Sequence, residues 1–275
     1  KRQALFPVII GAGNGVGIAG AFALTAVVLT VFAVGYVAMS KHITNAGAFY
    51  AFITRGLGRP MGLGSASLAI FGYNAIQLGV IGGFGYYASE FITRHTGAVI
   101  PWWVLSFLVM GASLFLGVRQ IHVGTRVLAV LLTLETGIIL LLDVGILSNS
   151  PTPISDFSLE PFAPSAVFAG AIGVALMFAH ASFIGFEGTA IYGEEAKDPK
   201  RTVPRATYTA VIFMGAFYSV TAFLIVNTVG INNAVGLAET EGGDLVFAVS
   251  NSVLGGAATE AVSYTHLRAH ETSLH

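Results

Sequence analysis

Long apolar runs separated by short polar segments dominate this sequence. Seven runs approach or exceed the roughly 20 residues that a helix needs to cross the hydrocarbon core of a bilayer, and they lie at 20–39, 61–89, 99–117, 126–148, 166–192, 206–229 and 245–261. We expect the last run to be the start of a further span. Because only helices and closed barrels satisfy their backbone hydrogen bonds in lipid, the pattern predicts an all-α polytopic membrane protein.

Composition supports a membrane environment. Of the 275 residues, 55% are apolar and 10% are charged, and the mean hydropathy is +0.78, whereas about a quarter of the residues of a soluble domain are charged. The net charge of −1 gives no electrostatic reason to expect nucleic acid as a partner. The absence of cysteine excludes disulfides.

Both ends of the sequence depart from the apolar pattern. The chain begins at Lys1 rather than at a methionine, so we expect a fragment. Residues 5–19 are apolar but rich in glycine, which fits either the end of an earlier helix or a loop returning from it. After Val262 the apolar pattern stops, and we expect residues 262–275 to be a non-native tail. One transmembrane domain over residues 1–261 is therefore predicted.

The basic residues alternate from one loop to the next. Loops 40–60, 118–125 (extended to Arg126) and 193–205 hold nine lysines and arginines, whereas loops 90–98, 149–165 and 230–244 hold only Arg94. Because cytoplasmic loops are enriched in basic residues, the first set is predicted to be cytoplasmic in a multi-pass plasma-membrane protein. Loop 40–60 is predicted to contain a short interfacial helix with its apolar face in the lipid, because it carries Phe49, Tyr50, Phe52 and Ile53.

The run 166–192 is too long for one straight span. Its 27 residues would extend about 40 Å as a helix, against a hydrocarbon core of about 30 Å. Gly185 and Gly188 flank Glu187, and glycine lowers the cost of unwinding. A break would leave N–H groups for a carboxylate and C=O groups for an ammonium group, so it could bind the backbone of an amino acid. The alternative is an unbroken helix whose glycines serve close packing.

Other polar residues inside the runs have two interpretations each. Glu187 could bind a proton or organise the unwound segment, or it could accept a hydrogen bond from a neighbouring helix. Glu135, nine residues inside the run 126–148, could titrate during transport or form a structural hydrogen bond. Asp143 is expected to be solvated at the opposite end of that run, and His180 to be a satisfied core residue.

Asn74 and Gln77 are three residues apart in the run 61–89 and therefore share a helix face. They could hydrogen-bond a substrate, or they could hold neighbouring helices together. The sequence does not choose between these two roles.

Three segments together resemble the amino acid–polyamine–organocation (APC) family of transporters. The sequence Phe183-Ile184-Gly185-Phe186-Glu187 is similar to a motif of the sixth helix of that family, and residues 194–206 are similar to the charged turn that follows it. Residues 47–50, Gly-Ala-Phe-Tyr, are similar to a pattern after the second helix. The resemblance covers roughly residues 18–261.

This resemblance implies helices two to seven and the start of helix eight of a LeuT-like fold, which contains two inverted five-helix repeats. In that fold the substrate lies at mid-membrane between broken helices one and six. The first helix is absent here or only hinted at in residues 5–17, so the fold is incomplete in this chain.

The resemblance also implies roles for single residues. Phe183, Ile184 and Gly185 would line the substrate site through backbone groups, and Phe186 would lie against the substrate. Glu187 would couple transport to an ion or stabilise the break.

These observations predict a secondary active transporter for amino acids or related amines that works by alternating access. Proton symport is the first expectation and exchange the second, with sodium as another possible coupling ion and no cofactor. The alternative from a different class is a membrane-embedded enzyme in which Glu135, Glu187 and His180 form a proton or metal cluster. That enzyme would require the three side chains to converge.

Overall fold

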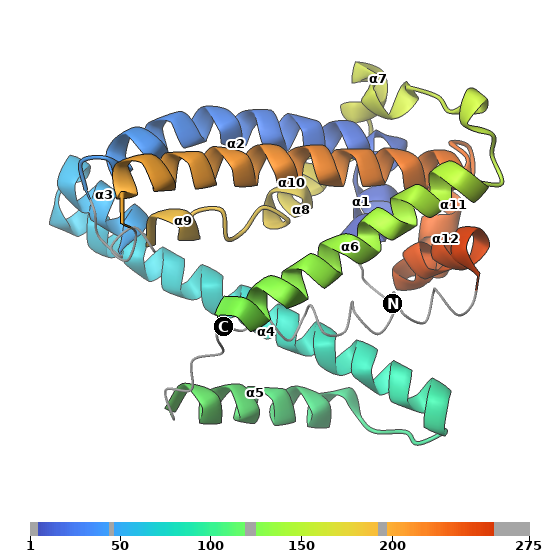
Figure 1. The fold of residues 1–275 in the computed structure, drawn as a ribbon, viewed down its shortest axis with the longest axis horizontal. Coiled ribbons are helices and arrows are strands. Elements are labelled where there is room, and N and C mark those ends of the chain that lie inside the picture. Colours follow the sequence, from blue (N-terminus) through green and yellow to red (C-terminus); the bar gives the residue numbers. More distant parts are fainter. Residues whose placement is uncertain (1–4, 44–46, 119–124, 192–196, 256–275) are drawn as a thin grey trace. The chain divides into compact units, whose positions relative to one another are not determined.

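A computed structural model describes residues 5–43, 47–118, 125–191 and 197–255. Over these ranges the chain forms helices joined by turns, with no strand (Figure 1). The all-α prediction is therefore confirmed for the described residues. The predicted tail, 262–275, and the last residues of the run 245–261 lie outside the described residues.

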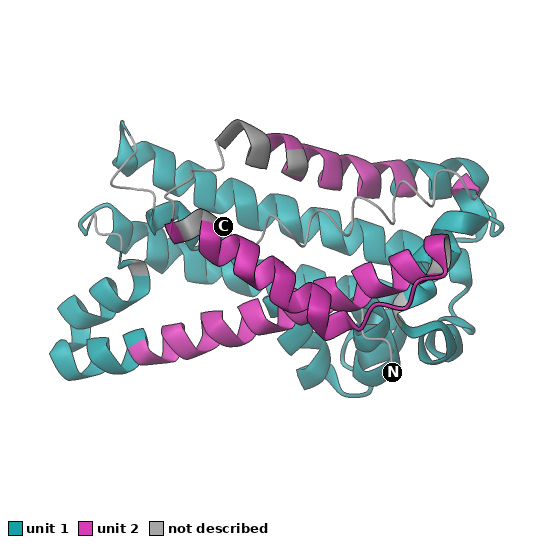
Figure 2. Ribbon diagram, turned by 90° about the horizontal axis from the view of Figure 1, so that it is seen from below, with its two compact units in different colours: residues 1–66, 143–253 teal, residues 67–142, 254–275 magenta. Residues whose placement is uncertain are grey.

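Two compact units divide the chain (Figure 2). One comprises residues 1–66 with 143–253, and the other comprises residues 67–142 with 254–275. The expectation of one transmembrane domain over 1–261 stays a prediction.

Helices α2 (Ile18–Ser40) and α10 (Pro199–Val229) lie side by side and antiparallel in the first unit (Figure 1). The Ser219 hydroxyl donates a 2.7 Å hydrogen bond to the carbonyl oxygen of Ala19. At Gly215 an added Cβ would lie 2.3 Å from the Cβ of Ala26, so only glycine permits this close approach. A small residue and a polar side chain, both on α10, thus fix the pair.

Helix α10 begins seven residues before the predicted start at 206. Pro199 stands in its first turn, where the missing N–H costs nothing, and Pro204 is accommodated within the helix. The predicted loop 193–205 is therefore helical from Pro199 onward.

The N-terminal residues form a bent helical segment that turns into α2. Short α1 (Leu5–Ile9) continues into the π-helical η1 (Ile10–Asn14) and the 3₁₀ turn η2 (Gly15–Gly17). The backbone leaves helical geometry at Gly13 and Gly15, the latter with φ +62°. Both alternatives for residues 5–19 thus hold in part, since a helix end is followed by a tight turn.

The run 166–192 is interrupted twice: at the break predicted around Gly185, and once more before it. Helices α7 (Pro164–Val167), α8 (Ile172–Ala181) and α9 (Gly188–Ile191) replace it. The first interruption was not predicted. It contains Gly170 at φ +54°, where an added Cβ would lie 2.6 Å from the carbonyl oxygen of Gly13. The N-terminal turn is therefore packed directly against this interruption.

Helix α3 (Ala48–Leu57) confirms the short helix predicted in loop 40–60. Its expected orientation is wrong for two side chains. Phe52 is buried and, with Phe49, packs against Tyr36 of α2 instead of facing lipid.

The second unit contains most of α4 (Arg59–Thr96), α5 (Trp102–Val118) and the first part of α6 (Thr125–Asn149). Helix α4 is 38 residues long and passes the predicted end at residue 89. It stops at Gly97, whose φ of +71° no longer fits a helix. The Ser106 hydroxyl joins α5 to α4 through a 3.1 Å hydrogen bond to the carbonyl oxygen of Ile81.

Short elements fill two of the connections between the longer helices. Between α6 and α7 lie the 3₁₀ turns η3 (Ile154–Asp156) and η4 (Glu160–Phe162). The loop predicted over 230–244 contains α11 (Ala234–Glu241) and η6 (Gly242–Asp244). Helix α12 (Leu245–Leu254) follows directly.

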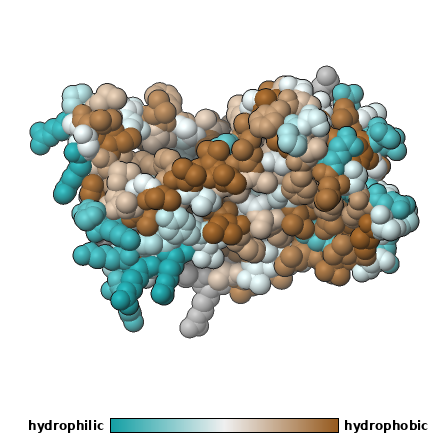
Figure 3. Space-filling view, turned by 90° about the horizontal axis from the view of Figure 1, so that it is seen from above, coloured by the Kyte–Doolittle hydropathy of each residue, from teal (hydrophilic) through white to brown (hydrophobic). Residues whose placement is uncertain are grey.

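Four helical stretches among the described residues are long and apolar enough to cross a membrane, and they are Phe6–Ser40, Arg59–Thr93, Leu132–Asn149 and Pro199–Val229. The apolar side chains of Val27, Val31 and Val34 form an exposed face of α2. Hydrophobic residues cover the middle of the face in Figure 3, and hydrophilic ones gather toward its ends. The chain is therefore a multi-pass membrane protein.

Candidate functional site

A helix opens between α8 and α9, at the place predicted from the glycines. Residues 182–187 form tight turns, and Gly185 has φ +108°, which L-residues with a side chain rarely adopt. An added Cβ at Gly185 would meet no atom within 4 Å. The backbone conformation, rather than crowding, therefore requires glycine here.

The backbone of this break offers acceptors rather than donors. The N–H groups of Ser182, Phe183, Ile184 and Phe186 donate to nearby carbonyls, and that of Gly185 donates to Glu187. The expected free N–H groups for a substrate carboxylate are thus not found at these five positions.

Two carbonyl groups of the break remain open. Within the described part of the chain, the carbonyl oxygens of Ser182 and Ile184 accept no hydrogen bond. Ile184 and Gly185 are exposed, so this side of the break can be reached from outside the bundle. Carbonyl oxygens of this kind suit an ammonium group or another cation.

Glu187 closes a local ring around Gly185. Glu187 is 6% exposed, and its Oε2 atom accepts a 2.9 Å hydrogen bond from the N–H of Gly185. A carboxylate can accept backbone hydrogen bonds strongly, so this contact holds the turn in shape. The contact links Glu187 to the unwound segment, and the role of Glu187 in coupling or gating stays a prediction.

Both phenylalanines of the motif place their rings inside the protein. Phe183 is 1% exposed and meets the ring of Tyr218 edge-on at 6.0 Å. Phe186 packs against Phe32 and Tyr36 of α2 at 6.2 Å. The binding roles of Phe183, Ile184, Gly185 and Phe186 stay predictions.

Tyr36 anchors the break to α2, and the sequence analysis did not identify it. Its hydroxyl donates a 2.7 Å hydrogen bond to the carbonyl oxygen of Glu187. Its fully buried ring is surrounded by the rings of Phe32, Phe49, Phe52 and Phe186, at centroid distances of 5.0 to 6.2 Å. The available signal was a single phenolic hydroxyl in a run whose other hydroxyl side chains are Thr25 and Thr30.

A second anchor joins α9 to α10. The hydroxyl oxygens of Thr189 and Thr207 lie 2.6 Å apart, and Thr207 also donates to the carbonyl oxygen of Val203. The segment after the break is thus held by α2 on one side and α10 on the other.

His180 lies in the last turn of α8, just before the break. Its Nδ1 atom is 2.7 Å from the carbonyl oxygen of Leu176 and 3.4 Å from the hydroxyl of the buried Thr25. A carbonyl can only accept, so Nδ1 carries the hydrogen. His180 is half-buried, and its Nδ1 atom has the partners that were expected of it.

Three further predicted residues lie in the second unit. Asn74 and Gln77 are exposed on α4, and the Asn74 amide donates to the carbonyl oxygen of Ile70. Glu135 is half-buried on α6. The substrate role of the first two and the coupling role of Glu135 stay predictions.

Asp143 departs from its prediction. It was expected at a solvated end of its helix, but the residue is 6% exposed and accepts a 2.9 Å hydrogen bond from Thr221 on α10. Burial between two helices was not visible in the sequence, because Asp143 stands only six residues before the helix end.

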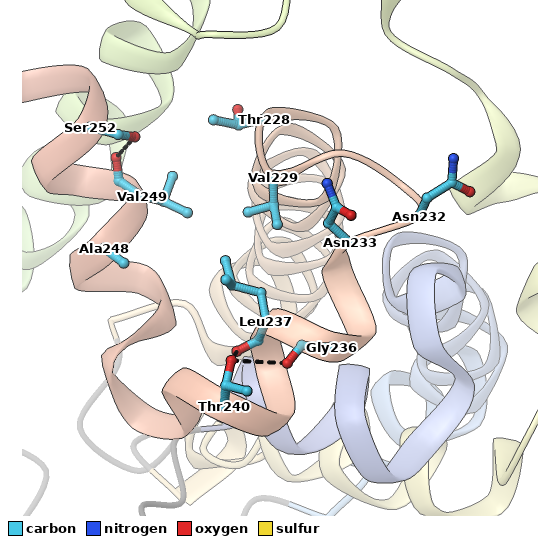
Figure 4. Close-up of a pocket in the computed structure, with 10 residues that line it drawn as sticks. All are labelled: Thr228, Val229, Asn232, Asn233, Gly236, Leu237, Thr240, Ala248, Val249 and Ser252. Carbon is cyan, nitrogen blue, oxygen red and sulfur yellow. Dashed lines mark hydrogen bonds between the residues drawn. The ribbon is translucent and has the colours of Figure 1, made fainter.

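A pocket of about 650 Å³ lies between the end of α10, α11 and α12 (Figure 4). Hydroxyl and amide side chains share its wall with apolar ones, and the lining residues are Thr228, Val229, Asn232, Asn233, Gly236, Leu237, Thr240, Ala248, Val249 and Ser252. Thr228 is 21 residues, or about 30 Å of helix, beyond Thr207, so the pocket is separate from the break.

The helical architecture and the break together indicate a class of protein. Apolar helices of spanning length and a helix interrupted beside a buried carboxylate are features of polytopic membrane transporters. Over the described residues, no three His, Cys, Asp or Glu side chains are grouped to bind a metal ion.

Comparison with known proteins specifies the family. Residues 4–263 match the amino acid permease family, and because the match spans most of the sequence, the chain belongs to that family. The resemblance to the APC family is thereby confirmed. Membership points to a transporter rather than an enzyme.

One curated relative is the branched-chain amino acid permease BcaP of Lactococcus lactis subsp. cremoris. The two sequences are 24% identical over 229 residues, which are 77% of this chain and 49% of the relative. The chain thus spans about half the length of the curated relative it matches.

Proposed function

We propose that this chain is part of a secondary active transporter that carries amino acids or related amines across the plasma membrane by alternating access. The proton is the proposed coupling ion, and loops 40–60, 118–125 and 193–205 face the cytoplasm. The observation that carries the proposal is the interrupted helix at Gly185 in a member of the amino acid permease family. A transporter needs no chemistry on its substrate, only a site that opens to each side in turn.

The proposed fold is LeuT-like, with two inverted five-helix repeats in the full-length protein. In that arrangement α8 and α9 would form the interrupted sixth helix, and α1 would contribute the last turn of the first. The packing of Ile9 and Ile10 in the same core cluster as Phe183 supports this pairing.

Substrate recognition begins, in this proposal, with the ammonium group. The open carbonyl oxygens of Ser182 and Ile184 carry partial negative charge at the end of a half-helix, which favours a cation. The substrate carboxylate would be bound by donors outside residues 182–186, because the N–H groups there already have acceptors. The name of the relative makes branched-chain amino acids the first substrates to test.

Uptake by proteoliposomes containing the full-length protein tests the proposal. A panel of labelled amino acids and amines is offered with and without an inward proton gradient. We expect the gradient to drive accumulation of at least one branched-chain amino acid. Absence of gradient-driven uptake, with accumulation only when the vesicles are preloaded with amino acid, would replace symport by exchange.

Competition by analogues tests the recognition step. The keto acid that corresponds to a transported amino acid, and its N-acetylated form, both lack the ammonium group. We expect neither to compete with labelled substrate, whereas the methyl ester, which keeps the ammonium group, should compete more strongly than either. Equal competition by the keto acid would contradict recognition through the carbonyl oxygens of Ser182 and Ile184.

A further inference from the structure

The end of α6, together with Ser150 directly after it, meets α10 through two polar pairs in equivalent register. The Asp143 Oδ2 atom accepts a 2.9 Å hydrogen bond from the Thr221 hydroxyl, and the Ser150 hydroxyl lies 3.5 Å from the Thr228 hydroxyl. Asp143 and Ser150 are seven residues apart, and so are Thr221 and Thr228. The two pairs therefore lie on the same face, separated by two helical turns, or about 10 Å. One pair contains a carboxylate, and the other contains only hydroxyls.

The carboxylate pair lies deep between the helices. Asp143 is 6% and Thr221 4% exposed, and the Oδ1 atom of Asp143 has no hydrogen-bond partner among the described residues. Ile146 and Ile225, which lie between the two pairs in each helix, are 0% and 1% exposed. An ionised carboxylate here would lose its hydration in return for one hydrogen bond, so the buried form has to be neutralised.

Basic side chains do not supply the neutralising charge in this part of the chain. The sequence contains no lysine or arginine between Arg126 and Lys197, nor between Arg205 and residue 255. On α10, Arg205 is 16 residues before Thr221, about 24 Å along the helix. The charged groups of the neighbouring elements are acidic, and they are Glu135 on α6, Asp156 in η3, Glu160 in η4, Glu239 and Glu241 on α11, and Asp244 in η6.

The remaining titratable groups are also placed elsewhere. Tyr218 on α10 turns its ring toward Phe22 and Phe183, and His180 bonds within α8 and to Thr25. A metal ion would need several further oxygen ligands, and the described residues bring no group of three His, Cys, Asp or Glu side chains together. The proton is the neutralising ion that requires only the one unpartnered oxygen.

We propose that Asp143 is a proton-binding site at the contact of α6 with α10. The proton is taken from water onto Oδ1, forming one O–H bond, while Thr221 continues to donate to Oδ2. The buried, closed contact is the protonated state. When the proton is released to water, the carboxylate of Asp143 is left with a negative charge that only solvent can stabilise. Deprotonation therefore favours separation of α6 and α10 at this point.

The pocket of Figure 4 lies beside the second of the two polar pairs. Thr228 lines the pocket, and its hydroxyl also lies near that of Ser150. The buried side chains of Ile146 and Ile225 lie between this pair and Asp143. The pocket of about 650 Å³ is lined in part by hydroxyl and amide groups, which can hydrogen-bond water. The positive-inside prediction puts this end of both helices on the outer side of the membrane.

Infrared spectroscopy of the full-length protein in lipid vesicles tests the site directly. We expect a carboxylic-acid C=O band in the wild type that diminishes as the pH is raised and that is lost in Asp143→Asn. Asp156→Asn removes an exposed carboxylate from η3 and should leave the band unchanged. A spectrum identical in wild type and Asp143→Asn would overturn the proposal, as would a band that responds to sodium at constant pH.

A second variant keeps the test decisive if Asp143→Asn does not fold. Thr221→Val preserves side-chain shape but removes the hydrogen bond to Oδ2, so the same band should shift in frequency while remaining pH-dependent. An unshifted band would contradict the assignment to Asp143.

The coupling of this proton to uptake rests on the proposed transport function, whereas its binding does not. We expect uptake by Asp143→Asn to lose its dependence on external pH. If the wild type transports nothing, the proposed function fails while the infrared result still decides the proton site. If uptake by the variant follows pH as in the wild type, the coupling role of Asp143 fails and transport stands.

Discussion

The hydroxyl of Tyr36 donates a 2.7 Å hydrogen bond to the carbonyl oxygen of Glu187, a residue 151 positions further along the chain. The side chain of the same glutamate accepts from the N–H of Gly185. The open turn between α8 and α9 is thereby braced from inside by a carboxylate and from α2 by a phenol. The two contacts use different atoms of Glu187, its backbone carbonyl and its side chain, so each can be removed separately.

Tyr36→Phe removes the hydroxyl and leaves the ring in its aromatic surroundings. The Glu187 carbonyl keeps the hydrogen bond from the N–H of Ala190 but loses the one from the phenol, so we expect the protein to lose about 1 kcal/mol of stability and the uptake rate to fall. Thermal unfolding in detergent and initial uptake rates measure these effects. Tyr50→Phe is the matched control, because Tyr50 is 46% exposed and should tolerate the change. Equal effects of the two substitutions would contradict an anchoring role for Tyr36.

Gly185→Ala places a side chain on a residue with φ +108°. No atom obstructs the new Cβ, so the cost is conformational, roughly 1–3 kcal/mol, and the turn should change shape. We expect loss of uptake with near-normal expression. Gly188→Ala, at the start of α9 and equally unobstructed, should retain uptake. Retention of full uptake in Gly185→Ala would show that this turn is not needed for transport.

Two substitutions at Glu187 separate bracing from coupling. Glutamine keeps an oxygen that can accept from the Gly185 N–H, whereas alanine does not, so Glu187→Ala should cost about 1–3 kcal/mol and Glu187→Gln much less. If the residue braces the turn, glutamine retains uptake and alanine abolishes it, which is the outcome we expect. Loss of proton-driven uptake in a well-folded Glu187→Gln protein would instead assign Glu187 to coupling.

Gly215→Ala tests the close contact between α2 and α10. The new Cβ would lie 2.3 Å from the Cβ of Ala26, so the helices must move apart, at a cost of about 1–3 kcal/mol. A lower unfolding temperature in detergent is the expected result. Gly35→Ala on α2 is exposed and meets no atom, so it should be neutral or slightly stabilising. A neutral Gly215→Ala would mean that the two helices pack less closely than described.

Local signals in the sequence located most of the helices. Apolar runs marked α2, α4, α5, α6 and α10, because burial in lipid depends on the composition of each run alone. The glycines around Glu187 also marked the break, since backbone freedom is a property of the residue itself. Helix ends were less well predicted: α4 continues to Thr96 and α10 begins at Pro199. Polar residues near a span end carry no signal that distinguishes helix from loop.

The sequence by itself therefore determined the class of protein, the approximate spans and the position of the break. Only the tertiary structure decided the partners of that break, because Tyr36 and Thr207 reach it from helices far away in the chain. It also decided the interruption at Gly170, which depends on the turn at Gly13 packing against it. Asp143 changed from a solvated residue to a buried one for the same reason. Hydropathy and conformational preference are local quantities, whereas burial and hydrogen bonding depend on which helix lies alongside.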